Sequence, residues 1–270
     1  MSGRVIVITS GKGGVGKTTA SANIGVALAT TGVSVALVDM DIGLRNLDIL
    51  MGLENRVVYN LVDVIEERCK LRQALVKDKR LPNLCLLPAA QTRDKTAVNA
   101  DQMKTLCTEL KSMFDFVIVD SPAGIESGFQ NAIAGADEGV IITTPEMSAV
   151  RDADRIIGLI EARKDEIKDH RLVINRIRPQ MVKTNDMMSV EDVLEILSVK
   201  LLGIVPEDEE IIISTNKGEP VSGTDNVRSG LAYRNIARRL RGEDVPFMDL
   251  DALNNTWVTK LVKFFTPVRA

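Results

Sequence analysis

A run of small and basic residues near the N-terminus has the composition and order of a phosphate-binding loop. It reads Gly11-Lys12-Gly13-Gly14-Val15-Gly16-Lys17-Thr18 and fits the pattern G-x-x-x-x-G-K-[ST]. Glycines let the backbone curl so that several N–H groups converge on one anion, and the next helix adds its positive dipole end. In such loops the lysine contacts the β- and γ-phosphates, and the final hydroxyl binds Mg²⁺. The run therefore predicts a site for a nucleoside triphosphate with magnesium.

The same glycines also match a second ligand class. Gly11, Gly13 and Gly16 fit the dinucleotide fingerprint G-x-G-x-x-G, and Asp39 ends the next expected strand, where a ribose-binding acid would lie. A dinucleotide site does not need Lys-Thr after the third glycine, nor a second acid at Asp41. These features favour a phosphate loop. A glycine turn without a ligand is favoured less than either, because glycines cost conformational entropy on folding.

Two further residues suit phosphate chemistry. Asp120 directly follows the apolar run Phe116 to Val119, the position of an acid that holds Mg²⁺ through water in P-loop proteins. Lys12 is not specified by an ordinary phosphate loop, and its side chain is expected to point away from the phosphates of its own subunit. Hydrolysis of a phosphoanhydride needs positive charge at the transition state, often supplied in trans. Lys12 would meet that need across a dimer interface; a solvated lysine is the alternative.

Short apolar strands and amphipathic helices alternate around these residues. The runs are continuous, as in strands buried on both faces, and comprise Val5–Ile8, Val35–Val38, Leu84–Leu87, Phe116–Val119, Val140–Ile142, Leu172–Ile174 and Leu202–Val205. Helices are expected over Thr18 to Thr31 and from an N-cap at Ser189. The alternation predicts an α/β fold with a doubly wound, mostly parallel sheet flanked by helices. Three segments are expected: a nucleotide-binding domain over 1–241, an acidic tether over 242–255 and an amphipathic helix over 256–267.

The composition excludes several classes of protein. Apolar runs are far shorter than the roughly 20 residues that a transmembrane helix needs. The net charge of −3 gives no general basic coat, so no nucleic acid is expected as a partner. The chain has three cysteines without metal-binding spacing, which are expected to be reduced in the cytoplasm, and one histidine, His170, expected at the surface near a helix end.

Three groups of residues together resemble the deviant Walker A family of P-loop ATPases, the ParA/MinD family. They are Lys12 to Thr19, Val38 to Asp41 and Val119 to Pro122. Longer stretches resemble the branch of this family that places the division septum, and the similarity covers essentially the whole chain; they are Asp41–Asp48, Gln91–Lys95, Asp120–Glu126 and Met188–Leu194. The cysteines needed by the iron-carrying branches are missing.

The resemblance implies a cycle of ATP binding and hydrolysis on a homodimer. ATP would join two subunits face to face, Lys12 would reach the phosphates of the partner, and Asp41 would handle the attacking water. Thr18, Asp39 and Asp120 would order Mg²⁺ and its waters. The catalytic set is thus Lys12, Lys17 and Asp41. The nucleotide would be held by Gly11, Lys12, Gly13, Gly14, Val15, Gly16, Lys17, Thr18 and Thr19, and its adenine by Asn175 and Arg176 after the sixth strand and Pro206, Glu207 and Asp208 after the seventh.

The resemblance also implies protein partners. A MinC-type division inhibitor would bind the ATP dimer, and a MinE-type activator would discharge it. The activator would act on a helix corresponding to Ser148 to Asp154, through Arg151, Asp152 and Asp154. From the residues alone, these charges are equally explained as a solvated helix face.

The C-terminus carries a separate signal. On a helical projection its apolar residues fill one arc of about 160°, with lysines on the opposite side; they are Trp257, Val258, Leu261, Val262, Phe264 and Phe265. Such a face predicts a helix that lies on an anionic membrane surface; a last helix packed on the core is the alternative. One such anchor binds weakly but two on a dimer bind together, so ATP-driven dimerisation would switch attachment on.

The residues predict a cytoplasmic ATPase that is peripheral on the inner face of the cell membrane, and the resemblance implies that it positions the cell or plastid division site by recruiting a division inhibitor. A ParA-like DNA-partitioning ATPase and a flagellar-placement relative are the alternatives.

Overall fold

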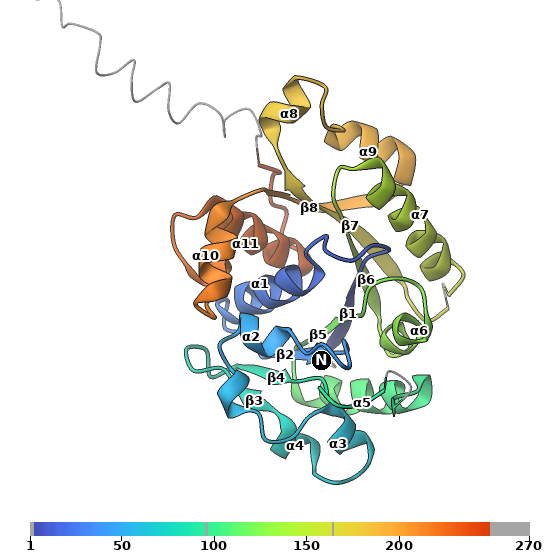
Figure 1. Ribbon diagram of the computed structural model, residues 1–270, viewed down its shortest axis with the longest axis vertical. Coiled ribbons are helices and arrows are strands. Elements are labelled where there is room, and N and C mark those ends of the chain that lie inside the picture. The colour runs from blue at the N-terminus through green and yellow to red at the C-terminus, as the bar shows by residue number, and fades with distance from the viewer. Residues whose placement is uncertain (1–2, 95–96, 164, 249–270) are drawn as a thin grey trace, which may run out of the picture.

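A central sheet covered by helices on both faces forms the body of the protein (Figure 1). The computed structural model describes residues 3–94, 97–163 and 165–248. The sheet has eight strands in the order β3-β4-β2-β5-β1-β6-β7-β8. All neighbouring strands run parallel except β3 and β4, which are antiparallel. The predicted doubly wound α/β class is confirmed.

All seven predicted strands are present, and the structure adds a short one at the edge. The strands are β1 (Arg4–Thr9), β2 (Val35–Asp39), β3 (Val76–Lys77), β4 (Leu84–Leu87), β5 (Phe116–Asp120), β6 (Glu138–Thr143), β7 (Asp169–Ile177) and β8 (Lys200–Pro206). Strand β3 is not evident from the sequence, because two residues are too few to show a hydrophobic period. His170 lies near a helix end as predicted, 3.8 Å from Glu161, the last residue of α7, but it belongs to β7 and is half-buried rather than at the surface.

The helices connect the parallel strands. They are α1 (Lys17–Ala29), α2 (Leu47–Leu50), α3 (Leu61–Ile65), α4 (Leu71–Ala74), α5 (Ala100–Met113), α6 (Ser127–Ile133), α7 (Met147–Glu161), α8 (Pro179–Lys183), α9 (Val190–Leu197), α10 (Glu209–Asn216) and α11 (Arg228–Leu240). Ser189 caps α9 as predicted. Its hydroxyl accepts from the amide of Asp192 at 3.0 Å, and the Asp192 carboxylate accepts from the amide of Ser189 at 2.9 Å.

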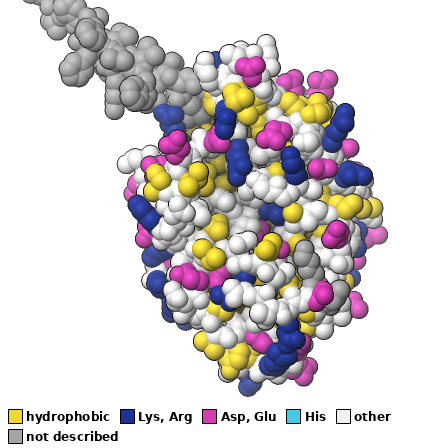
Figure 2. Space-filling view, in the orientation of Figure 1, with side chains coloured by type: hydrophobic (Ala, Val, Ile, Leu, Met, Phe, Trp, Pro, Cys, Tyr) yellow, Lys and Arg dark blue, Asp and Glu magenta, His cyan; other side chains and the backbone are white. Residues whose placement is uncertain are grey.

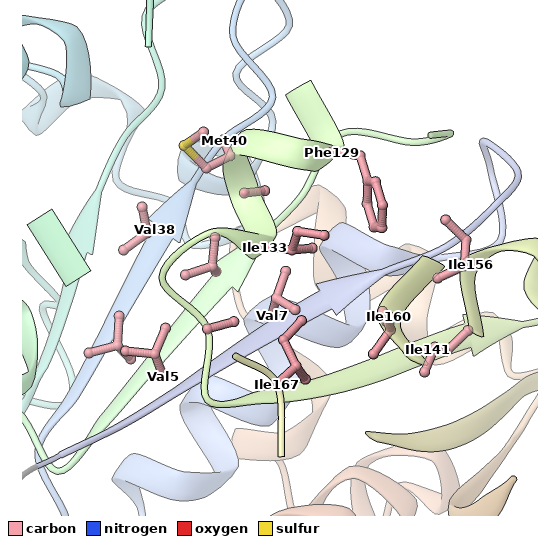
Figure 3. Close-up of a cluster of buried hydrophobic side chains, with 14 of the residues drawn as sticks. Val5, Val7, Val38, Met40, Phe129, Ile133, Ile141, Ile156, Ile160 and Ile167 are labelled. Atoms are coloured by element: carbon pink, nitrogen blue, oxygen red, sulfur yellow. The ribbon is translucent and has the colours of Figure 1, made fainter. Parts of the chain in front are cut away.

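Successive residues of the central strands point alternately into two separate hydrophobic cores, one on each face of the sheet. Val5 and Val7 of β1 face the core under α5, α6, α7 and α9, part of which is drawn in Figure 3. Ile6 and Ile8 face the opposite core under α1 and α11. Burial on both faces explains why the strands are uniformly apolar rather than alternating.

The strand order brings three chain segments together at the carboxyl ends of the central strands. β1, which leads into the glycine-rich loop, pairs with β5, and β5 pairs with β2. In this register Asp120 lies beside both Ile8 and Asp39. Two acids distant in sequence thus meet at the carboxyl ends of adjacent strands, where open α/β sheets bind ligands.

The chain that follows α11 stays in contact with the domain beyond Gly242. Arg239 donates to the carbonyls of Leu202, Val245 and Pro246 at 2.9, 3.0 and 2.8 Å. Its guanidinium also lies 4.2 Å from the centre of the Phe247 ring. Within the segment predicted as a tether over 242–255, the chain packs on the domain as far as Met248. Residues 249–255 and the predicted helix over 256–267, with Trp257, Val258, Leu261, Val262, Phe264 and Phe265, lie outside the described residues.

We expect Arg239→Met to release this segment. Losing charge-assisted hydrogen bonds to three carbonyls should lower the free energy of unfolding by about 2 kcal/mol, and limited proteolysis should cut between 242 and 248. Arg238→Met is the matched control, because Arg238 lies on the same helix but only pairs with Glu243 at the surface. Equal protease resistance of wild type and Arg239→Met would contradict this account.

Candidate functional site: a nucleotide-binding edge of the sheet

The glycine-rich loop follows β1 directly and is shaped by its glycines. Gly14 and Gly16 have φ angles of +81° and +97°, which favour glycine. A Cβ atom on Gly16 would lie 2.4 Å from Nδ2 of Asn175, so no larger residue fits there. The same Nδ2 donates to the carbonyl of Val15 at 2.7 Å. Asn175 of β7 therefore supports the loop from beneath.

The loop opens onto a helix end suited to an anion. Helix α1 begins at Lys17, and its N-cap Gly16 offers no side-chain cap. The first amides of a helix have no intrahelical partner, so they remain available to a phosphate. Lys17 is only 9% exposed, and Thr18 follows it on the same turn. The remaining loop residues, Gly11, Lys12 and Gly13, precede this turn and complete the predicted phosphate cradle.

Two buried carboxylates lie beside this helix end. Asp39 is fully buried, and burial together with the charge of Asp120 raises its pKa to about 7. Burial also raises the pKa of Asp120 to about 6, opposed by the charge of Lys17 and by hydrogen bonds from Ser21 and Thr18. Ser21 donates to Oδ1 of Asp120 at 2.8 Å and was not identified from the sequence. Its place one turn after Thr18 was the available signal.

These residues fit a magnesium ion held with a nucleotide. Oδ2 of Asp120 is buried and has no hydrogen-bond partner, although a buried carboxylate oxygen normally has one. Among the described residues there is no cluster of three or more His, Cys, Asp or Glu that could hold a metal. Magnesium seldom needs such a cage, because it keeps waters and shares phosphate oxygens. Thr18, Asp39 and Asp120 suit that mode.

Asp41 lies in the loop after β2, at the same carboxyl ends of the strands as Asp39 and Asp120. The amide of Asp41 donates to one oxygen of Asp39 at 2.9 Å, and the amide of Leu47 donates to the other at 3.2 Å. The carboxylate of Asp39 thus closes the loop at both ends. Asp41 is half-buried and close enough for its charge to raise the pKa of both Asp39 and Asp120.

Lys12 points to helix α7 within its own subunit. Its Nζ lies 3.0 Å from Oγ of Ser148 and 3.6 Å from the carboxylate of Glu146. The side chain is 43% exposed, so it is not locked there by burial. A Cβ atom on the neighbouring Gly11 would lie 2.2 Å from the carbonyl oxygen of Asp152. The phosphate loop therefore packs directly against α7.

A cavity of about 200 Å³ lies beside the loop, between β7 and α10. Its lining comprises Gly16, Thr19, Asn175, Arg176, Glu207, Asp208, Ile211 and Ile212. The predicted adenine residues therefore meet here except Pro206, which ends β8 outside the lining. Asn175 and Arg176 lie inside β7 rather than after it. The sequence analysis missed Ile211 and Ile212, although an apolar run directly after acidic residues was a usable signal.

The two acidic residues that line this cavity, Glu207 and Asp208, are held in place by contacts with neighbouring side chains. Glu207 forms an ion pair with Arg178, which lowers the pKa of the Glu207 carboxyl. Asp208 caps α10 and also accepts from the hydroxyl of Ser229 at 2.9 Å. Asp208 therefore joins the first turns of α10 and α11 and fixes one wall of the cavity.

Comparison with known proteins identifies the family. Residues 6–221 match the model of the CobQ/CobB/MinD/ParA nucleotide binding domain. The septum site-determining protein MinD of a Synechocystis species is 59% identical over 96% of this chain and 97% of its own length.

The chain belongs to the MinD family of septum site-determining proteins.

Solved structures of the family share its fold. A chain of the MinC:MinD cell division complex of Aquifex aeolicus superposes with a TM-score of 0.85, at 47% identity over 91% of this chain and 99% of that one. MinD of Pyrococcus horikoshii, complexed with Mg-ADP, gives a TM-score of 0.79 at 28% identity, over 88% of this chain and 95% of that one. Such identity over the full length places the chain with MinD proteins rather than with partition ATPases.

The MinD-family helix predicted to bind partners is α7. Arg151 and Asp154 are exposed on it, whereas Asp152 is half-buried and its backbone lies against Gly11. The structure therefore places one of the three residues beside the phosphate loop and two on the outer surface. In the described part of the chain, no helix is long and apolar enough to cross a membrane.

We expect the stabilisation by Mg-ADP to grow with pH. Both buried carboxyls have folded pKa values above the ordinary 3.8, so the folded apo protein holds their protons more tightly than the unfolded chain. Apo stability should therefore fall as pH rises from about 4 through 7. Magnesium competes with those protons, so the rise in Tm caused by Mg-ADP should be larger at pH 8 than at pH 6. ADP with EDTA is the control, and equal rises at both pH values would contradict the prediction.

Proposed function

We propose that this chain is a magnesium-dependent ATPase that dimerises with ATP and positions the division site from the inner face of the cell membrane. The observation that carries the proposal is the meeting of Asp39, Asp120 and Lys17 at an uncapped helix end. Membership of the MinD family and the Mg-ADP complex of a relative support it.

Each residue has a distinct task in hydrolysis. The loop amides and Lys17 bind the phosphates, while Ser21 and Thr18 orient the Asp120 carboxylate. Magnesium, when bound, neutralises phosphate charge and orders water around it. Asp41 accepts a hydrogen bond from the attacking water and holds it in line with the terminal phosphate. No covalent intermediate on the protein is needed, because positioning and charge stabilisation carry the reaction.

Lys12 completes the site across the dimer. Within one subunit its Nζ lies against Ser148 and Glu146 rather than on its own loop. A partly exposed ammonium on a flexible stem is free to leave these surface contacts for the stronger charge of phosphates bound by the partner. Hydrolysis is thereby coupled to dimerisation.

We expect Asp41→Ala and Lys17→Ala to separate hydrolysis from binding. Asp41→Ala should lose at least about a hundredfold in turnover yet still form ATP-dependent dimers, because Asp41 handles the water. Lys17→Ala should lose the dimers themselves, because a phosphate contact is lost. Sedimentation with ATP or with ADP measures dimerisation, and phosphate release from ATP measures turnover. Wild-type turnover by Asp41→Ala would refute its role, and normal dimers of Lys17→Ala would refute the phosphate-loop assignment.

Division-site placement is proposed to act through a MinC-type inhibitor, with a MinE-type activator ending the cycle. The structure of a MinC:MinD complex from a relative supports the first partner. The exposed residues Arg151 and Asp154 of α7 offer a contact surface for the MinE-type activator. Because Asp152 of this helix lies against Gly11, a partner that moves α7 would disturb the phosphate loop. On the face shown in Figure 2, basic and acidic side chains are interspersed, so no single-sign field dominates it.

Membrane attachment is proposed to use the C-terminal segment over 256–267. Its sequence combines an apolar aromatic face with lysines, which suits an anionic lipid surface. One short anchor gives weak binding, whereas two on a dimer gain about 10²-fold or more by avidity. ATP binding would therefore control attachment without a change in the anchor itself.

We expect Phe264→Glu and Trp257→Glu to release the protein from anionic vesicles. Each places a carboxylate within the apolar face, and burying it unpaired costs several kcal/mol. Basal ATPase activity and solution dimerisation should remain. Thr259→Glu is the matched control, because it adds the same charge to the polar side. Should the apolar-face variants unfold or lose ATP binding, the segment belongs to the core instead.

A further inference from the structure

We propose that Arg45 and Asp48 are positioning residues that hold Asp41 in place for hydrolysis. Neither is assigned a role above. The proposal rests on the proposed ATPase function, and it concerns the loop over 40–46, which joins β2 to α2 and carries Asp41.

Arg45 and Asp48 form a buried ion pair at the end of this loop. Nε and Nη2 of Arg45 both lie 2.7 Å from Oδ2 of Asp48. The Asp48 side chain is fully buried and that of Arg45 is 15% exposed. Charged hydrogen bonds of this kind are strong when water is excluded. Oδ1 of Asp48 is also buried and has no hydrogen-bond partner. Arg45 is therefore the charged group that offsets the cost of burying this carboxylate.

The backbone at Arg45 is held in an uncommon conformation. Its φ angle is +40°, in the left-handed region that residues with a Cβ atom seldom adopt. Its amide donates to the carbonyl of Asp41 at 3.1 Å. The turn that orients Asp41 is therefore closed by a residue under backbone strain. Such strain persists only where the surroundings enforce it, and the ion pair with Asp48 supplies that constraint.

The other contacts of the loop are hydrogen bonds from its backbone amides, and none of them holds the Arg45 side chain. The amide of Leu44 also donates to the carbonyl of Asp41 at 3.1 Å, so two amides close this turn. The amides of Asp41 and Leu47 donate to the carboxylate of Asp39, and the amide of Gly43 donates to the carbonyl of Ala90 at 2.8 Å. Asp39 is also a proposed magnesium residue, so its hold on the loop changes when the metal binds. The ion pair keeps the turn independent of that change, which lets Asp41 stay in place through the cycle.

Arg45→Met tests the proposal, because it keeps the length of the stem and removes the charge. We expect turnover to fall by about tenfold to a hundredfold, the range that misplacement of a reacting group produces. The KM for ATP and ATP-dependent dimerisation should stay within about twofold, because the phosphate loop is untouched. Hydrogen exchange of the amides over 41–47 in the apo protein should accelerate. Arg45→Lys, which keeps one charged donor, should give intermediate values in both measurements.

The control is Arg56→Met, a matched change at an exposed arginine that donates to the carbonyl of Lys77. It should alter neither turnover nor exchange of the loop. If Arg45→Met fails to fold, Arg45→Lys and Asp48→Asn carry the test, with circular dichroism as the check of folding.

Normal turnover and normal exchange in a folded Arg45→Met would overturn the proposal. Equal losses of turnover and ATP binding would also overturn it, because they indicate general disruption. Failure of the proposed function is distinguishable: wild type would then lack ATPase activity, whereas the exchange measurement on the apo protein would still report whether the ion pair holds the loop.

Discussion

Two carboxylates buried side by side constrain this molecule more than any other feature. Asp39 and Asp120 are paired in register at the ends of neighbouring strands, out of water and beside one lysine. Burial is the main cause that raises the pKa of Asp39 to about 7 and that of Asp120 to about 6, and nearby carboxylates add to it: Asp120 for Asp39, and Asp41 for both. Such an arrangement lowers the stability of the apo protein near neutral pH, and a bound divalent cation would offset that cost.

The surroundings of this pair connect it to the loop of Asp41 and to the elements beside the phosphate loop. The carboxylate of Asp39 accepts hydrogen bonds from the amides of Asp41 and Leu47, at the two ends of the loop that carries Asp41. On the other side, Gly11 lies against the backbone of Asp152 in α7, and Asn175 of β7 supports Val15 and Gly16. A Cβ atom on Gly11 or Gly16 would clash at these contacts, so the phosphate loop is closely packed against α7 and β7.

The C-terminal chain leaves the domain from a different part of the sheet. Arg239 binds it beside Leu202, near the beginning of β8, whereas the nucleotide site lies at the carboxyl ends of the strands. The side chain of Arg4, at the start of β1, likewise contacts the carbonyl of Leu240. The described chain as far as Met248 is therefore held at the end of the sheet opposite the nucleotide site.

The sequence by itself determined seven of the eight strands, the helices that open at the phosphate loop and at Ser189, the phosphate loop itself and the acids that end β2 and β5. These signals are local, because a glycine pattern, a continuous apolar run or an N-cap such as Ser189 acts within a few residues. Only the tertiary structure decided which distant residues meet: Ser21 with Asp120, Lys12 with Ser148, Arg45 with Asp48, and Ile211 beside Arg176. It also decided that the chain from Gly242 to Met248 packs on the domain, and that β3 completes the edge. Those outcomes depend on strand order and side-chain packing, which no periodicity within one segment encodes.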